Sequence, residues 1–192
     1  MSQHWDRLEG KKFLVGRDEV RDSDTITIIS NDELEDFVAE LLGVNYQFPG
    51  VGRTRTLRFF GIDSMELDQP MGLDGHNRTQ QLLLPYEQIG IDVKDVDRYG
   101  RIVAEITAPE DNFDSDCAIN KMLVREGYAV AYQYWLRKAG GTYYQRYMAD
   151  QDFARENKYN FWNLPDEQRI YPMVWRKNKR EREENTRWKT GQ

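Results

Sequence analysis

The chain has 192 residues, of which 39% are hydrophobic, 31% charged and 12% aromatic, and its formal net charge is -6. This composition predicts one globular domain of ordinary size with some extra segments, and it excludes a disordered or fibrous chain. With two histidines and one cysteine, the chain has neither an intramolecular disulfide nor a cysteine-built zinc site. We expect Cys117 to be a buried packing residue.

Charge is distributed unevenly. Residues 1–154 carry 27 acidic and 17 basic side chains, whereas residues 155–192 carry six acidic and ten basic ones. An acidic body suits a protein that handles a divalent cation, and it serves solubility equally well. No apolar run is long enough to span a bilayer, and the N-terminus lacks the apolar stretch of a secretory signal. We therefore expect no membrane association and a cytoplasmic location by default, with secretion by another route left open.

The first elements are two strands and a helix. The apolar stretches FLVG and TITII, separated by a polar run, predict a pair of strands within residues 13–30, with Asp24 at the start of the second. Ser30 and Glu33 have the spacing of a capping box, and apolar residues then recur at helical intervals up to Gly43. Residues 56–63, TLRFFGID, alternate like a strand between two layers, with Arg58 on the opposite side from Leu57.

Patterns in the second half of the sequence predict three helices and a hairpin. Residues 72–84 form a helix that ends at Pro85, and residues 89–96 and 101–106 flank the turn DRYG as a hairpin. A helix follows at about 116–125 with Gly127 as its stop, and a last one runs from Thr142, in capping-box spacing with Gln145, to near Asn160. Beyond residue 175 the charged tail is either a solvated helix or disordered.

This order has about five strands and no regular alternation of strand and helix. It indicates an α+β fold rather than a parallel doubly wound sheet. A small five-stranded barrel surrounded by helices fits the count.

Three segments combine carboxylates and arginines: DSDT at 22–25, RFFGIDSMELDQP at 58–70 and DRYGR at 97–101. Carboxylates at strand ends can converge on a hard cation such as calcium, and hydrolysis of a phosphodiester needs an activated water and positive groups on the phosphoryl oxygens. Arginine supplies that charge with paired donors. Each segment alone has an ordinary structural explanation as a turn, cap or ion pair.

GIDSMELDQP, with Arg58 five positions before Asp63, resembles the signature of the staphylococcal nuclease (thermonuclease-like) family. DSDT, DRYGR, LVREGYAVAYQYW and KYNFWN resemble four more of its segments, in the right order. The resemblance covers residues 12–163, with an insertion at about 30–53, an N-terminal extension at 1–11 and a charged C-terminal extension at 164–192. It implies a five-stranded oligonucleotide-binding (OB) barrel flanked by three helices, here with an extra helix between early strands.

The resemblance also implies a calcium-dependent nuclease, a hydrolase that cuts DNA and RNA and leaves 3'-phosphate ends. Arg58, Glu66 and Arg101 match its catalytic residues, with Glu66 as the proposed general base. Asp24, Asp63, the Ser64 carbonyl and, through water, Glu66 match its calcium ligands. The positions that match its substrate-binding residues are Arg98, Tyr99, Tyr132 and Tyr134.

Two departures stand out: Ser64-Met65 replaces Thr-Pro or Ala-Pro, and Ser23 replaces a glycine. Loss of the proline predicts a looser loop around Glu66. We expect a monomer that prefers single strands, with endonuclease and exonuclease modes both open. Tyr132 and Tyr134, on a segment expected to be extended, suit half-buried packing as well as base stacking. The alternative from another functional class is a catalytically silent domain that binds nucleic acid or a protein partner.

Overall fold

The structure is a computed structural model that describes residues 11–42 and 54–190. A closed barrel has the strand order β1-β2-β3-β6-β5, in which the β3–β6 pair is parallel and the other pairs are antiparallel. This is the strand order of an OB-fold barrel, and it confirms the predicted α+β class. The barrel strands are β1 (Lys12–Asp22), β2 (Thr25–Ile29), β3 (Thr54–Phe59), β5 (Gln88–Val96) and β6 (Ile102–Thr107).

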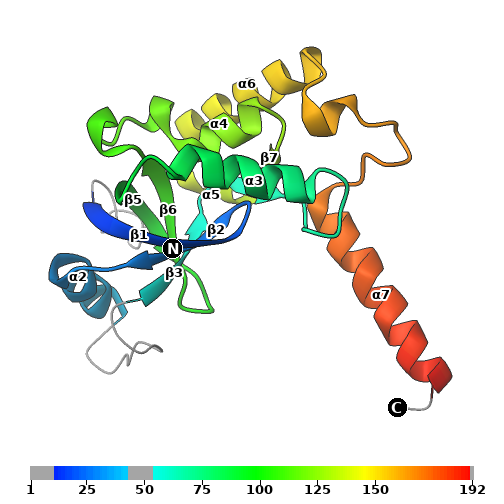
Figure 1. The fold of residues 1–192 in the computed structure, drawn as a ribbon, viewed down its shortest axis with the longest axis horizontal. Helices are drawn as coiled ribbons and strands as arrows, with labels where there is room; N and C mark the ends of the chain where they lie inside the picture. The colour runs from blue at the N-terminus through cyan, green and yellow to red at the C-terminus, as the bar shows by residue number, and fades with distance from the viewer. Residues whose placement is uncertain (1–10, 43–53, 191–192) are drawn as a thin grey trace.

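Helices surround this barrel (Figure 1). The helix α2 (Asp32–Leu42) lies between β2 and β3, where the sequence predicts an inserted helix; the rest of that insertion and the N-terminal extension up to residue 10 lie outside the described residues. The others are α3 (Gly72–Leu83), α4 (Ile119–Arg125), α5 (Gln133–Ala139), α6 (Gly141–Glu156) and α7 (Pro172–Thr190). Short 3-10 helices cover residues 109–111, 115–117 and 160–163.

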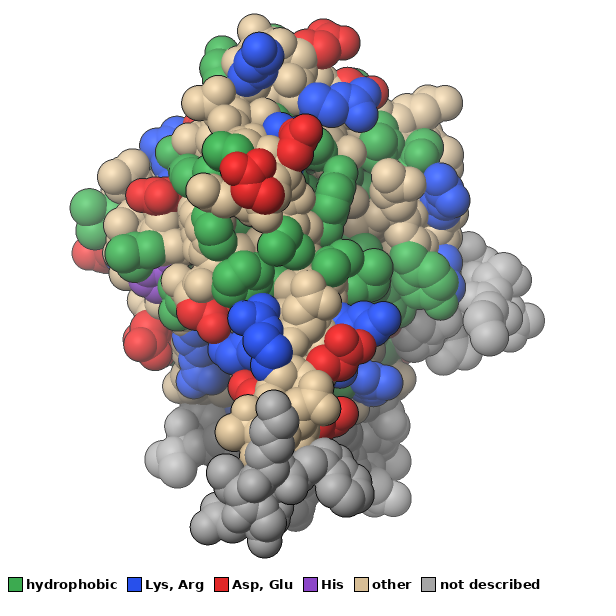
Figure 2. All heavy atoms as spheres, turned by 90° about the vertical axis from the view of Figure 1, so that its right-hand side faces the viewer, with side chains coloured by type: hydrophobic (Ala, Val, Ile, Leu, Met, Phe, Trp, Pro, Cys, Tyr) green, Lys and Arg blue, Asp and Glu red, His purple; other side chains and the backbone are tan. Residues whose placement is uncertain are grey.

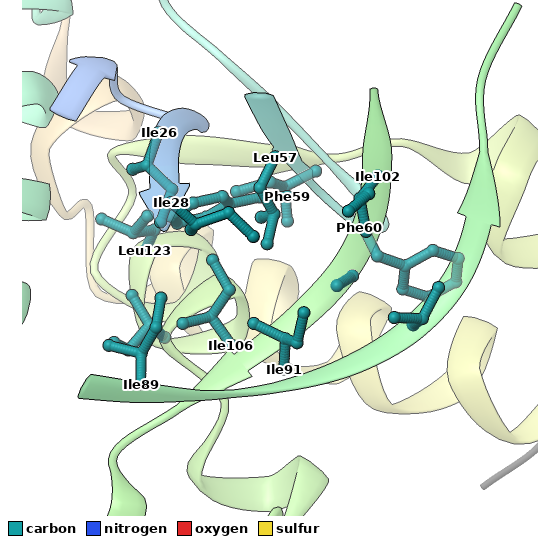
Figure 3. Close-up of a cluster of buried hydrophobic side chains, with 14 of the residues drawn as sticks. Ile26, Ile28, Leu57, Phe59, Phe60, Ile89, Ile91, Ile102, Ile106 and Leu123 are labelled. Atoms are coloured by element: carbon teal, nitrogen blue, oxygen red, sulfur yellow. The ribbon is translucent and has the colours of Figure 1, made fainter. Parts of the chain in front are cut away.

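The core forms because apolar residues alternate along the barrel strands and face inward. Leu57 in β3 is paired with Ile26 of β2 and Ile102 of β6, and Ile91 of β5 with Ile106 of β6. These side chains are at most 1% exposed, and Leu123 of α4 joins them from the helical layer (Figure 3). Burial of this kind supplies the main favourable term in folding.

One polar residue ties α4 to the barrel. Asn120 is fully buried, its Nδ2 donates to the carbonyls of Phe60 and Ala104, and its Oδ1 accepts from the Ile106 N–H. All three partners belong to β6 or to the end of β3, so the amide fixes the helical layer against the strands that carry the cleft described below. A buried amide with its hydrogen bonds made stabilises one particular arrangement.

Several local predictions are corrected. Asn31, not Ser30, caps α2, since its Oδ1 accepts from the Leu34 N–H 2.9 Å away, while the Ser30 hydroxyl bonds the Glu35 carboxylate. The helix α6 begins at Gly141, so Thr142 lies inside it, and no side-chain cap bond is made at its N-cap Gly140. Cys117 is half-buried rather than buried.

The stretch predicted as one strand over 56–63 is two strands. Gly61, with φ of 74°, turns the chain after Phe60, so β3 ends at Phe59 and β4 (Ile62–Ser64) leaves the barrel. β4 pairs with β7 (Ala129–Ala131) in a separate two-stranded sheet, which the sequence does not predict. Leu136 packs against Gly61, where a Cβ would lie 2.7 Å from its Cδ2. This turn sends β4 toward the helical layer and sets the position of the site.

The charged C-terminal tail is helical, which is one of the two alternatives that the sequence predicts for it. In Figure 1, α7 is a single helix that projects away from the rest of the molecule. No helix in the described ranges combines the length and apolar character needed to cross a membrane.

Candidate functional site

The site begins where β2 and β3 run side by side. Arg58 is opposite Thr25 in the register, and its side chain points out of the barrel because its neighbours Leu57 and Phe59 point in. Its Nη1 lies 2.7 Å from Asp24 Oδ2, and its Nη2 lies 3.5 Å from Asp63 Oδ1 and donates to the Ile62 carbonyl. The guanidinium therefore bridges one carboxylate from the turn between β1 and β2 and another from β4.

The short strand β4 supplies Asp63 and Ser64, both buried. The Ser64 N–H donates to Asp24 Oδ2 over 2.8 Å, which ties the loop between β1 and β2 to β4. Asp63 is opposite Val130 of β7, so the helical layer holds β4 from the other side. Asp24 and Asp63 are thus fixed in the same region although 39 positions separate them in the sequence.

Glu66 lies in the loop between β4 and α3, and this loop is tightly held. Gln69 brackets it, because its Oε1 accepts from the Glu66 N–H and its own N–H donates to the Glu66 carbonyl. Met65, which stands where the family commonly has proline, is fully buried. Backbone bracketing and a buried anchor therefore restrain the loop in place of a fixed proline dihedral.

At Gly72, the backbone at the start of α3 lies directly against the backbone of this loop. A Cβ built on it would lie 1.8 Å from the Glu66 carbonyl oxygen and 2.6 Å from the carbonyl carbon. Both are backbone atoms, so they could not move aside without moving Glu66 itself. Glycine at this position keeps the start of α3 packed directly on the loop.

Gly72→Ala is expected to displace Glu66 and to lower the free energy of unfolding by about 1–3 kcal/mol, the usual range for overpacking. A displacement of this kind is also expected to lower kcat for the hydrolysis that the sequence resemblance implies, by roughly tenfold to a hundredfold. Denaturant unfolding and steady-state kinetics measure the two effects. Gly141→Ala is the matched control, because a Cβ there meets nothing within 4 Å. Equal behaviour of the two variants would contradict the prediction.

The turn of the hairpin carries three of the predicted residues. Arg101 is fixed by Asp97, whose Oδ2 lies 2.7 Å from Arg101 Nε and whose Oδ1 accepts from the Arg101 N–H. The Tyr99 side chain is 66% exposed, with Arg98 over its ring at 4.8 Å and Arg101 at 5.6 Å. The turn thus presents two cations and an aromatic face to solvent.

Tyr132 and Tyr134 differ from the expectation of an extended segment. β7 ends at Ala131, and Tyr134 is the second residue of α5. The carbonyl of Tyr132 accepts the N–H groups of Trp135 and Leu136, which starts the helix. Leu136 is fully buried, so its packing on Gly61 overrides the strand propensity of alternating tyrosines.

The site residues predicted from the sequence line one cleft of about 730 Å³. It brings together every residue that the sequence predicts for the site: Asp24, Arg58, Asp63, Ser64, Glu66, Arg98, Tyr99, Arg101, Tyr132 and Tyr134. The carboxylates lie toward β4 and the aromatic residues toward the hairpin turn and α5.

Comparison with known proteins agrees with this geometry. Residues 56–164, more than half of the chain, match the family described as staphylococcal nuclease homologue. The chain belongs to this family. It is also similar to a protein of Shigella flexneri named micrococcal nuclease, with 29% identity over 128 residues that cover 65% of this chain and 70% of that protein. The staphylococcal nuclease fold and these matches support a nuclease-type hydrolase function.

Two residues of this staphylococcal nuclease homologue enter the cleft without having been singled out in the sequence: Asp22 and Arg176. The pKa of Asp22 is raised to about 6, first by burial and then by repulsion from Asp24 and Glu66. DSDT indicates Asp22 in retrospect, because β1 ends there and both aspartates of this segment line the cleft. Arg176 begins the charged run RKNKREREE, a pattern typical of a solvated helix, so its sequence context gives no signal.

The donor set fits a hard cation. Asp22, Asp24 and Asp63 supply carboxylate oxygens to the cleft, the atoms that a hard cation prefers. Burial, and then repulsion from Asp24, raises the pKa of Asp63 although Arg176 and Arg58 lower it. Within residues 11–42 and 54–190, however, no three acidic, histidine or cysteine side chains are gathered as metal ligands. Arginines are bound between the carboxylates instead: Arg58 joins Asp24 to Asp63, and Arg176 joins Asp63 to Glu66.

Proposed function

We propose that this chain is a calcium-dependent nuclease that hydrolyses phosphodiester bonds in DNA and RNA, prefers single strands and leaves 3'-phosphate ends. The observation that supports it most is the placing of Arg58 and Arg101 on the same cleft as Asp24, Asp63 and Glu66. Fold maintenance gives no reason for these charges to share one cavity, whereas phosphodiester hydrolysis requires both kinds.

Asp24, Asp63, the Ser64 carbonyl and, through a water molecule, Glu66 would hold the calcium ion. When bound, calcium polarises the phosphate and orients the attacking water. Glu66 accepts the proton of that water. Its backbone is bracketed by Gln69, so the carboxylate is held in a restricted region before substrate arrives.

Arg58 and Arg101 stabilise the charge that builds on the phosphoryl oxygens. Arg58 is held by its bonds to Asp24, Asp63 and the Ile62 carbonyl, and a donor positioned before the reaction needs little reorganisation during it. Arg101 is one-third exposed, so its guanidinium can reach a phosphate that enters from solvent.

Single strands suit the aromatic end of the cleft. Tyr99 and Tyr134 are more than half exposed, and unstacked bases can pack on such rings whereas the bases of a duplex are already stacked. Arg98 beside Tyr99 adds a phosphate contact in this proposal. The monomeric state and the cytoplasmic location stay predictions from the sequence.

The test is hydrolysis of heat-denatured DNA and of RNA at mildly alkaline pH, with millimolar calcium or excess chelator, for the wild type, Arg101→Ala and Arg155→Ala. Arg155, an exposed arginine that pairs with Asp152 on α6, is the matched control. We expect cleavage only with calcium, products that a 3'-phosphatase can dephosphorylate, and a loss of about 10²- to 10³-fold in Arg101→Ala alone. Binding of single strands without cleavage under any condition would instead support the silent-domain alternative.

A further inference from the structure

The helix α7 starts at a fixed place beside the cleft. The Tyr171 ring packs edge-on against Phe161 at 5.6 Å and Trp162 at 6.2 Å, and the Gln69 side-chain amide donates to the Ile170 carbonyl. Gln69 is the same residue that brackets Glu66. The loop that carries Glu66 and the start of α7 are therefore joined through one side chain.

Beyond this anchor, polar contacts hold the first turns of α7. Arg176 Nη2 lies 3.0 and 2.8 Å from the two carboxylate oxygens of Asp63, and Nη1 lies 2.7 Å from Glu66 Oε1. One turn later, Lys179 Nζ lies 2.8 Å from Asp68 Oδ2. Figure 2 looks at the face from which α7 projects and shows basic and acidic side chains next to each other there.

Apolar burial in the first turn of α7 is limited to Pro172, which is buried, and Trp175, which is half-buried. Met173 and Val174, in the first turn of α7, are 61% and 41% exposed. Arg176 itself is 39% exposed, so its ion pairs are accessible to water and to other cations. Pairs of this kind contribute modest free energy and are screened by salt, so the docked helix can be displaced.

Arg176 engages the same oxygen atoms that the proposed reaction needs. Both oxygens of Asp63 are its acceptors, so they face a guanidinium where they would face a metal ion. Its other arm donates to Glu66 Oε1, so a guanidinium occupies a carboxylate oxygen that the proposed reaction needs for the attacking water. Burial lowers the pKa of Arg176, but its bonds to Asp63 and Glu66 outweigh this and raise it, so the side chain stays charged.

We propose that α7 is an autoinhibitory strap, in which Arg176 and calcium compete for Asp63 and the cleft becomes active only when the cation displaces the arginine. The inference rests on the proposed calcium-dependent function and adds its regulation. Calcium binding is then coupled to release of the first turns of α7, and the calcium concentration needed for activity is higher than the carboxylates alone would require.

The test measures calcium binding without nucleic acid, by isothermal titration calorimetry on the full chain, for the wild type, Arg176→Gln and Arg180→Gln. Arg180 lies one turn further along α7, is exposed, and gives the same loss of charge away from Asp63. We expect Arg176→Gln to bind calcium about tenfold more tightly than the wild type and Arg180→Gln to stay within about twofold of it.

Hydrogen exchange of the backbone amides at 173–179 gives a second readout, independent of activity. In the wild type, calcium is expected to speed this exchange; in Arg176→Gln, exchange is expected to be fast before calcium is added. Equal calcium affinity in all three proteins, or exchange that calcium leaves unchanged, overturns the strap while the nuclease proposal stands. If none of the three proteins binds calcium, the strap and the calcium-dependent function fail together.

Discussion

Glu66→Gln is expected to lower kcat for single-stranded DNA by about 10²- to 10⁴-fold, the range that a positioned general base contributes. Glutamine keeps the size and the backbone of the residue, so the bonds from Gln69 to the loop are retained. It cannot accept a proton from water. Affinity for an oligonucleotide is expected to change by less than about threefold, because phosphate binding in our proposal falls to the arginines.

The same substitution also weakens the docking of Arg176, which loses a charged acceptor. Glu66→Gln should therefore be measured in the wild type and in the Arg176→Gln background, with Glu156→Gln, at the exposed end of α6, as the control. A loss of kcat in both backgrounds supports the role as base. If Glu66→Gln leaves kcat unchanged in the Arg176→Gln background, the role of Glu66 as base is refuted.

Arg58→Ala is expected to reduce both activity and stability. Its side chain is 16% exposed, and its partners Asp24 and Asp63 are 7% and 6% exposed, so truncation leaves the buried Asp24 carboxylate without this cation. Removing one partner of such a buried pair lowers the free energy of unfolding by about 3–5 kcal/mol, and we expect the lower end because Arg176 still pairs with Asp63. Loss of a fixed donor lowers kcat by at least about 10²-fold.

Denaturant unfolding with and without calcium separates the two contributions of Arg58. Calcium is expected to recover part of the lost stability in Arg58→Ala, because a ligand that binds the folded state stabilises it. Arg155→Ala, which breaks an exposed pair, is expected to change the free energy of unfolding by less than about 1 kcal/mol. Wild-type stability in Arg58→Ala would show that the pairs with Asp24 and Asp63 contribute nothing to the fold.

Local patterns predicted most of the barrel. The alternation around Leu57, the hairpin at DRYG and the helix before Gly43 are signals within a few residues, and the structure has β3, the β5–β6 hairpin and α2 there. Alternation also placed Arg58 outside the barrel, because its neighbours must face the core. The residues at the site were predicted by resemblance in five ordered segments, and the cleft contains all of them.

Long-range features were not predictable in this way. The β4–β7 sheet pairs Asp63 with Val130, and such a pairing leaves no mark in either segment by itself. The helical state of Tyr134 depends on the burial of Leu136 against Gly61, which is a tertiary contact. Arg176 reaches Asp63 from 113 positions away, and its polar neighbours predict only an exposed helix. In each case the missing information is which distant segment packs against the one being considered.

The two-stranded sheet also has a consequence for how the protein is made. Barrel closure needs β6, which ends at Thr107, and the support behind Asp63 needs β7, which ends at Ala131. Contacts this far apart in sequence form late, because long loops must be ordered before the contacts stabilise them. During synthesis, therefore, the cleft cannot assemble until the chain has been produced as far as β7, and a nascent chain shorter than this carries the acidic residues without their geometry.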